Sequence, residues 1–116
     1  MNSLKNRVQL IGHLGNTPEL KSFENGVKLA KFSIATNERF KNAKGEYETE
    51  TQWHQIVAWG GAAERVSKAL QKGNEVALEG KLITRNYQDK DGQTRYITEV
   101  VLGDFVRLTK KEEVAS

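Results

Sequence analysis

A single segment of this chain has the period of a helix, whereas the sequence on both sides of it has the period of strands. Between residues 61 and 70, the apolar residues Ala63, Val66 and Leu70 fall on one helical face. Gly73 then marks a typical helix end. A doubly wound fold would need several such helices, and a β-sandwich rarely needs one. The chain is therefore expected to be mainly β with one helix.

The remaining segments alternate apolar and polar residues, which is typical of strands with one face in a core. Residues 20–24 are expected to fold back through Asn25-Gly26, the strongest short hairpin signal, which predicts a type I′ turn. Residues 37–50 are polar and charged and are interpreted as a long, mobile loop. Three strands are expected before the helix and two after it: residues 7–14, 27–36, 51–59, 75–88 and 94–108.

Three strands, one helix and two strands is the order of the OB-fold, a small and partly open barrel. The predicted class is therefore all-β: a five-stranded OB-fold Greek-key barrel with one helix between strands 3 and 4. We expect one domain over residues 1–108 and a short flexible tail at 109–116. The chain has 116 residues, which is enough to bury one core.

Composition argues against several kinds of chemistry. The chain has no cysteine, and its two histidines, His13 and His54, lie in different strand-like segments. No metal, cofactor or catalytic residue is expected, because His, Asp and Glu do not form a convergent set. No apolar run reaches the length of a membrane span and no secretory signal is present, so we expect a cytoplasmic protein without membrane contact. The net charge of +3 mildly favours polyanionic partners.

Four aromatic residues suggest a surface that stacks on the bases of single-stranded DNA. Trp53 and Trp59 share one register of the third strand, and the other register can supply the barrel interior. Aromatics at this spacing are often core, but Gly60-Gly61 directly after Trp59 marks a strand end. Phe40 and Tyr87 stand in polar surroundings where burial is hard to arrange. Stacking contributes roughly 1–3 kcal/mol per base without demanding a sequence.

Basic residues beside these aromatics would contact the phosphates of the same strand. The clustering is clearest for Arg39 and Lys41, on either side of Phe40, and for Arg85 near Tyr87. For the other candidate cations, a solvated surface charge is the competing interpretation: Arg7, Lys21, Lys44, Lys72, Lys81 and Arg95. His54 lies in the register opposite the tryptophans, so we expect it at the rim of the core or in a subunit contact.

A series of short segments carries a resemblance to a known family. The match spans about residues 6–108 with few gaps, and the combination is far more specific than any one motif. The sequence closely resembles the bacterial single-stranded DNA-binding protein family. The matching segments are residues 6–15, Pro18-Glu19, Asn25-Gly26, residues 32–36, Trp53-His54, residues 78–80 and residues 96–101.

The resemblance implies a homotetramer of OB domains, in the cytoplasm at the nucleoid, that protects single-stranded DNA during replication, repair and recombination. It places His54 near the subunit contact and base stacking at Phe40, Trp53, Trp59 and Tyr87. It also implies phosphate contacts from Arg7, Lys21, Lys72, Arg85 and Arg95. Several positions that are often basic in the family are neutral here, so we expect binding to depend more on stacking than on charge: Gln55, Gly61, Ile83 and Asn86.

The end of the sequence leaves protein partners open. Members of this family usually continue into a flexible linker and an acidic tip that recruits other proteins, whereas this sequence ends at residues 110–116, so we expect a naturally short or a truncated chain. Two other functions also stay open. One is an OB accessory protein whose main role is contact with a replication-restart protein. The other is a nuclease with a carboxylate-held metal, which the scattered acidic residues disfavour.

Overall fold

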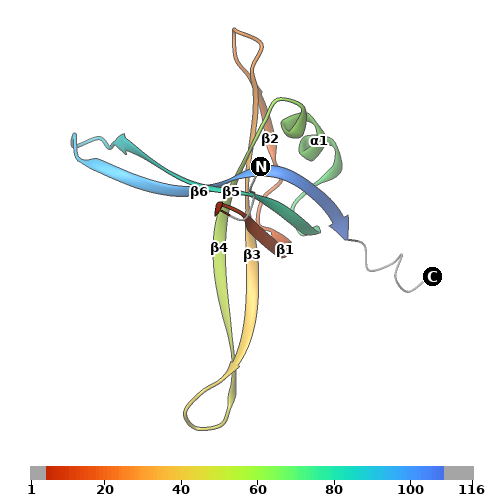
Figure 1. Cartoon of the computed structure of the whole chain (residues 1–116), viewed down its shortest axis with the longest axis vertical. Helices are drawn as coiled ribbons and strands as arrows, with labels where there is room; N and C mark the ends of the chain where they lie inside the picture. The colour runs from red at the N-terminus through yellow and green to blue at the C-terminus, as the bar shows by residue number, and fades with distance from the viewer. Residues whose placement is uncertain (1–4, 109–116) are drawn as a thin grey trace, which may run out of the picture.

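The computed structural model describes residues 5–108 and contains strands with a single helix among them (Figure 1). The predicted tail at 109–116 lies outside the described residues. The elements in chain order are β1 (Val8–Leu14), β2 (Glu19–Ser22), β3 (Lys28–Lys41), β4 (Tyr47–Trp59), α1 (Gly61–Ala69), β5 (Glu75–Gln88) and β6 (Thr94–Leu108).

The strands close into a barrel. Hydrogen-bonded neighbours follow the order β1-β5-β6-β4-β3-β2, and a further pairing of β1 with β3 completes the circuit. β2 pairs with β3 alone, so the circuit itself has five strands and the predicted five-stranded OB-fold barrel is confirmed. Closure brings backbones close together at Gly12, where a Cβ atom would lie 2.3 Å from the carbonyl oxygen of Ala35. Only glycine permits this approach.

The core follows from strand and helix periodicity. Phe32 and Ile34 of β3 and Ile56 of β4 are fully buried at alternating positions of their strands. Val66 brings the apolar face of α1 onto the same cluster. The helix ends at Ala69, and the glycine expected to end it has a φ of 92° in the turn that follows.

The prediction of a long loop at residues 37–50 is wrong. β3 and β4 pair without interruption from Leu29 and Trp59 to Lys41 and Tyr47, and only residues 42–46 form the turn. Phe40 therefore lies on a strand. Side chains on both faces of the outer part of this ribbon are mainly exposed, so its polar composition reflects hydration of a paired ribbon.

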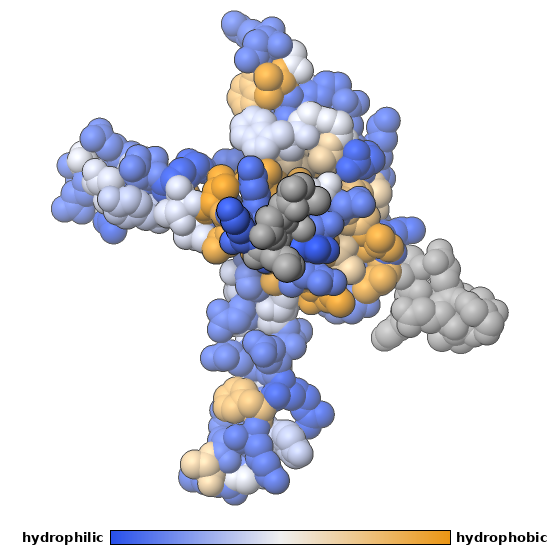
Figure 2. All heavy atoms as spheres, in the orientation of Figure 1, coloured by the Kyte–Doolittle hydropathy of each residue, from blue (hydrophilic) through white to orange (hydrophobic). Residues whose placement is uncertain are grey.

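Two long hairpins extend from the barrel in different directions (Figure 1). We call residues 35–53 the β3–β4 arm and residues 83–99 the β5–β6 arm. Both carry mainly hydrophilic residues, whereas apolar residues gather nearer the centre of the molecule (Figure 2). The barrel thus holds the core, and the arms present polar ribbons to solvent.

The Asn25-Gly26 hairpin is present, but its turn differs from the predicted type I′. A type I′ turn needs positive φ at both central residues, and here Gly26 has a φ of 85° while Asn25 does not have a positive φ. The amide of Phe23 donates to the carbonyl of Val27 at 2.9 Å, so three residues form the loop. Gly26 occupies the left-handed position at the end of that loop.

The turns at the tips of the two arms have the same hydrogen-bonding pattern. Gly45 and Gly92 have φ values of 84° and 79° and occupy equivalent places. At the start of each turn, one side-chain oxygen accepts two backbone amides: Asn42 Oδ1 at 2.9 and 3.0 Å, and Asp89 Oδ1 at 2.9 and 3.0 Å. The two turns therefore differ mainly in the charge of the residue that organises them.

Candidate nucleic-acid interface

The two tryptophans lie on the outward register of β4. Trp53 is 60 % exposed and Trp59 is 49 % exposed, whereas Ile56 and Ala58 in the opposite register are fully buried. Large aromatic side chains bury readily, so two exposed indoles on one strand face need a reason. Their placement gives the barrel two flat apolar surfaces that face solvent along one strand.

The indole of Trp53 packs against the turn that follows β1. A Cβ atom on Gly15 would lie 2.6 Å from Cζ3 of Trp53, so the glycine makes room for the ring. The neighbouring Asn16 fixes this turn to β3, because its Oδ1 accepts the amide of Ser33 at 2.9 Å and the Ser33 hydroxyl at 3.0 Å. One edge of the ring is thus held by rigid backbone.

Trp59 borders a groove between the strands that begin the two arms. The groove has a volume of about 360 Å³. Its apolar lining comes from Leu29, Val57, Trp59 and Ile83, and its charged lining comes from Lys31, Arg85 and Glu99. Sequence reasoning did not include Lys31 or Glu99. The aromatic residue next to Lys31 is Phe32, which is buried in the core, and Glu99 has no aromatic neighbour in the sequence.

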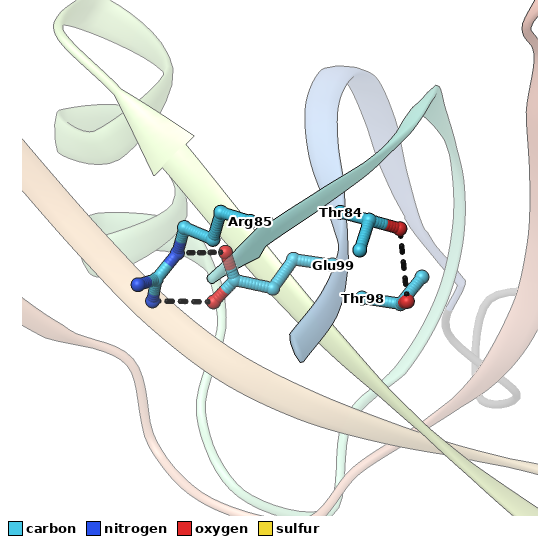
Figure 3. Close-up of polar contacts among 4 residues, drawn as sticks. All are labelled: Thr84, Arg85, Thr98 and Glu99. Atoms are coloured by element: carbon cyan, nitrogen blue, oxygen red, sulfur yellow. Dashed lines mark hydrogen bonds and ion pairs between the residues drawn. The ribbon is translucent and has the colours of Figure 1, made fainter. Parts of the chain in front are cut away.

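Arg85 and Glu99 form a two-point ion pair in this groove (Figure 3). Arg85 Nε donates to Glu99 Oε1 at 2.9 Å and Nη2 donates to Oε2 at 3.3 Å. The Glu99 side chain is only 4 % exposed, while that of Arg85 is 46 % exposed. The hydrogen bond from Arg85 to Glu99, followed by the attraction of the two charges, raises the pKa of Arg85 above its usual value.

The β3–β4 arm has one basic, aromatic face and one acidic face. Arg39 and Lys41 share a register with Trp53 and Tyr47. The Arg39 guanidinium lies 4.9 Å from the centre of the Tyr47 ring, and the Lys41 ammonium lies 5.9 Å from it, both within cation–π range. The opposite register carries acidic side chains at Glu38, Glu48 and Glu50.

Tyr47 was missed by sequence reasoning, although it is 65 % exposed. The even spacing of Tyr47 and Trp53 puts both on one face of β4 once this segment is known to be a strand. Phe40 is 43 % exposed but falls in the opposite register, beside Glu48. The structure therefore does not bring Phe40 onto the face of the tryptophans. Tyr87, which is 47 % exposed, shares the register of Arg85.

The other predicted phosphate-binding cations have mixed surroundings. Arg7 lies 3.3 Å from Glu79, and Arg95 lies 2.8 Å from Asp89, so both pair with carboxylates. Lys21, on β2, lines a hollow that also includes Lys31. Lys72 follows the helix, and its backbone amide donates to Thr17 Oγ1 at 3.0 Å.

His54 lies at the rim of the barrel interior. It pairs across the strands with the buried Ile34, and its Nε2 lies 2.9 Å from the Thr36 hydroxyl. The side chain is half-buried, as a position at the rim of the core requires. The predicted subunit contact at His54 stays a prediction.

Two further features of residues 5–108 bear on the site. Within that range, no group of three or more His, Asp or Glu side chains could hold a metal ion. The helix α1, the one helix in the same range, is too short to cross a bilayer.

Comparisons with known proteins agree on one family. The model of the single-strand binding protein family matches residues 5–108. Single-stranded DNA-binding protein 1 of Chlorobaculum tepidum is 44 % identical over 108 residues, which cover 92 % of this chain and 67 % of that protein. Single-stranded DNA-binding protein 1 of Xylella fastidiosa is 38 % identical over 109 residues, which cover 93 % of this chain and 80 % of that protein.

Solved structures give the same answer. A Plasmodium falciparum SSB in complex with single-stranded DNA superposes with a TM-score of 0.83 and 34 % identity, over 90 % of this chain and 95 % of that one. A deletion mutant of the single-stranded DNA-binding protein from Thermus aquaticus superposes with a TM-score of 0.80 and 25 % identity, over 91 % of this chain and 51 % of that one. From the family model and these relatives together, the chain belongs to the single-strand binding protein family.

Proposed function

We propose that this chain binds single-stranded DNA on the outer face of the barrel, with little sequence preference and without a chemical step. The observation that carries the proposal is the pair of exposed indoles on one face of β4, with Arg39 and Lys41 farther along the same face. Membership in the single-strand binding protein family supports it, and one structural relative is described as a complex with single-stranded DNA.

The proposed mechanism combines stacking with phosphate contact. Bases stack on Trp53, Trp59 and Tyr87, and Tyr47 extends the same surface toward the tip of the β3–β4 arm. Each stacked base contributes roughly 1–3 kcal/mol, and because every base has a π-face the contact selects no sequence. Arg39, Lys41 and Lys31 attract the phosphates. Lys21 and Lys72 add to this attraction, and Arg7 and Arg95 add less because each pairs with a carboxylate. We assign this activity to the protection of DNA during replication, repair and recombination, in the cytoplasm at the nucleoid.

A titration of intrinsic fluorescence with oligo-dT tests the proposal. Stacking on Trp53 and Trp59 should quench the emission strongly, and the apparent affinity should fall as salt rises. Duplex DNA of the same length is the control and should bind much more weakly. No quenching at low salt, or equal affinity for duplex DNA, would contradict the proposal.

We also propose that the chain self-associates, as a homotetramer. An apolar row crosses β1, β5 and β6 on the outside of the barrel, because Ile11 lies opposite Ala77 and Ala77 lies opposite Val106. Ile11 is 55 % exposed and Val106 is 60 % exposed, so the row has no partner within the described chain. Light scattering should give a mass above that of one chain, and Ile11→Glu should lower it. A monomeric parent protein would refute the assignment.

A further inference from the structure

Glu99 is the one charged residue within residues 5–108 whose side chain is buried, and it lies in the groove beside Trp59. Burying a carboxylate is costly unless the charge is paired and hydrogen-bonded. Glu99 meets both conditions through Arg85, which reaches it from the neighbouring strand. The pair is therefore held in one geometry by the burial of its acidic member.

This geometry changes what Arg85 can offer to a ligand. A guanidinium has five N–H donors, and the contacts with Glu99 use one on Nε and one on Nη2. The two donors of Nη1 and the second donor of Nη2 remain, in a fixed plane. The positive charge, in contrast, is offset by a carboxylate in direct contact. Arg85 thus keeps directional donors while its attraction for a phosphate is reduced.

The surroundings of the pair fit a flat, mostly apolar ligand. Leu29, Val57 and Ile83 line the groove, and the Trp59 ring borders it. The volume of about 360 Å³ is ample for one nucleobase. Lys31 supplies a cation in the same lining, and among the described residues it forms no ion pair.

We infer that Glu99 is a positioning residue that makes this groove a nucleobase subsite, in which Arg85 donates to acceptor atoms on a base and does not act as a phosphate contact. The inference rests on the proposed function. The base stacks on Trp59, Arg85 donates to its carbonyl or ring-nitrogen atoms, and Lys31 attracts the adjoining phosphate. This assigns Arg85 a role different from the one that its charge alone suggests.

Salt dependence separates the two roles of Arg85. Each phosphate contact on single-stranded DNA adds about 0.7 to the slope of log affinity against log salt concentration. We therefore compare the parent protein, the double variant Arg85→Gln/Glu99→Gln and Lys31→Gln, using anisotropy of a labelled oligo-dT between low and high salt. The double variant removes a pair with no net charge and should weaken binding roughly three- to tenfold, the effect of one net hydrogen bond, with the slope unchanged. Lys31→Gln should make the slope shallower by about 0.7.

A shallower slope for the double variant, equal to that of Lys31→Gln, would overturn the inference, and so would an unchanged affinity. Glu99→Gln provides the converse test, because it releases the charge of Arg85 and should steepen the slope by about 0.7. An unchanged slope in a folded Glu99→Gln protein would also refute the inference. If that variant does not fold, the double variant Arg85→Gln/Glu99→Gln decides alone, since it leaves no buried carboxylate without its partner. A parent protein that binds no oligo-dT would instead refute the proposed function.

Discussion

The two arms are paired hairpins with closely similar turns, yet their basic side chains have different kinds of partner. On the β3–β4 arm, Arg39 and Lys41 lie over the Tyr47 ring, and the acidic side chains occupy the other face of the ribbon. On the β5–β6 arm, Arg85 and Arg95 each contact a carboxylate, at 2.9 and 2.8 Å.

The difference shows that the partner of a basic side chain decides whether its net charge or only its hydrogen-bond donors remain available to a ligand. A cation over an aromatic ring keeps its net charge, because the ring offers a quadrupole and no counter-charge. A cation beside a carboxylate keeps its donors but loses most of its long-range attraction. The β3–β4 arm therefore suits phosphate attraction, and the β5–β6 arm suits directional contacts.

The largest effect expected is at the base of the β3–β4 arm. Trp53→Ala removes a stacking surface and should weaken oligo-dT binding by roughly 1–3 kcal/mol, or about five- to 150-fold. The matched control is Tyr96→Ala, because Tyr96 is 70 % exposed but lies on the β5–β6 arm in the register opposite Arg85 and Tyr87. Anisotropy of a labelled oligonucleotide measures both. An equal loss for Tyr96→Ala would place the binding face elsewhere.

The next effect distinguishes the two faces of the β3–β4 arm. Tyr47→Ala should weaken binding by about 1 kcal/mol, because it removes a ring and the support for Arg39 and Lys41. Phe40→Ala should cost less, since Phe40 lies among acidic side chains on the other face. The same anisotropy assay compares them. A larger loss for Phe40→Ala would show that DNA contacts the acidic register, contrary to the division proposed here.

A smaller effect concerns charge on the two arms. Arg39→Gln should make the salt slope shallower by about 0.7, because one phosphate contact is lost. Arg95→Gln should change the slope by less, since Asp89 already offsets its charge. Affinities measured at several salt concentrations give both slopes. Equal changes would remove the distinction between the arms.

The smallest effect is on stability and concerns the two turns. The hydrogen bond from Arg95, followed by that from the Gln93 amide, lowers the pKa of Asp89 below its usual value of 3.8. A carboxyl whose pKa falls on folding stabilises the folded state above the unfolded-state pKa, and this contribution is lost as pH falls through the lower folded value. Asp89→Asn should therefore lower Tm slightly at pH 7.

That difference in Tm should shrink toward zero as the pH falls below about 3.8, where the charge of Asp89 is being lost. Asp91→Asn, in the same turn, is the control and should shift Tm less at pH 7 because the Asp91 side chain forms no ion pair among the described residues. Thermal melts by circular dichroism at both pH values test this. A constant difference across the pH range would mean that the charge of Asp89 has no part in the turn.

The fold could be predicted because the order of its strands and helix follows from short stretches of sequence. One helical segment and well-marked strands suffice to choose the barrel. The length of the β3–β4 arm could not be predicted, because a ribbon hydrated on both faces lacks the apolar alternation that marks a half-buried strand. Phe40 was misplaced for this reason, and Tyr47 was overlooked.

The binding face was predictable only where the period of a strand decides it. Trp53 and Trp59 are an even number of positions apart, so they must share a face. The pair of Arg85 and Glu99 depends on the register between β5 and β6, and a shift of register at Glu79 and Gly80 makes that register hard to derive from sequence. Contacts across strands therefore needed the structure.

The spacing of the two tryptophans also sets a length scale for the ligand. Trp53 and Trp59 are six positions apart on one strand, which at about 3.3 Å per residue places them roughly 20 Å apart. Stacked bases follow one another at about 3.4 Å, so neighbouring bases cannot occupy both indoles. A strand that engages both must extend several nucleotides between them. Very short oligonucleotides should therefore reach only one indole, and the minimum length for full quenching becomes a direct readout of the path of the DNA.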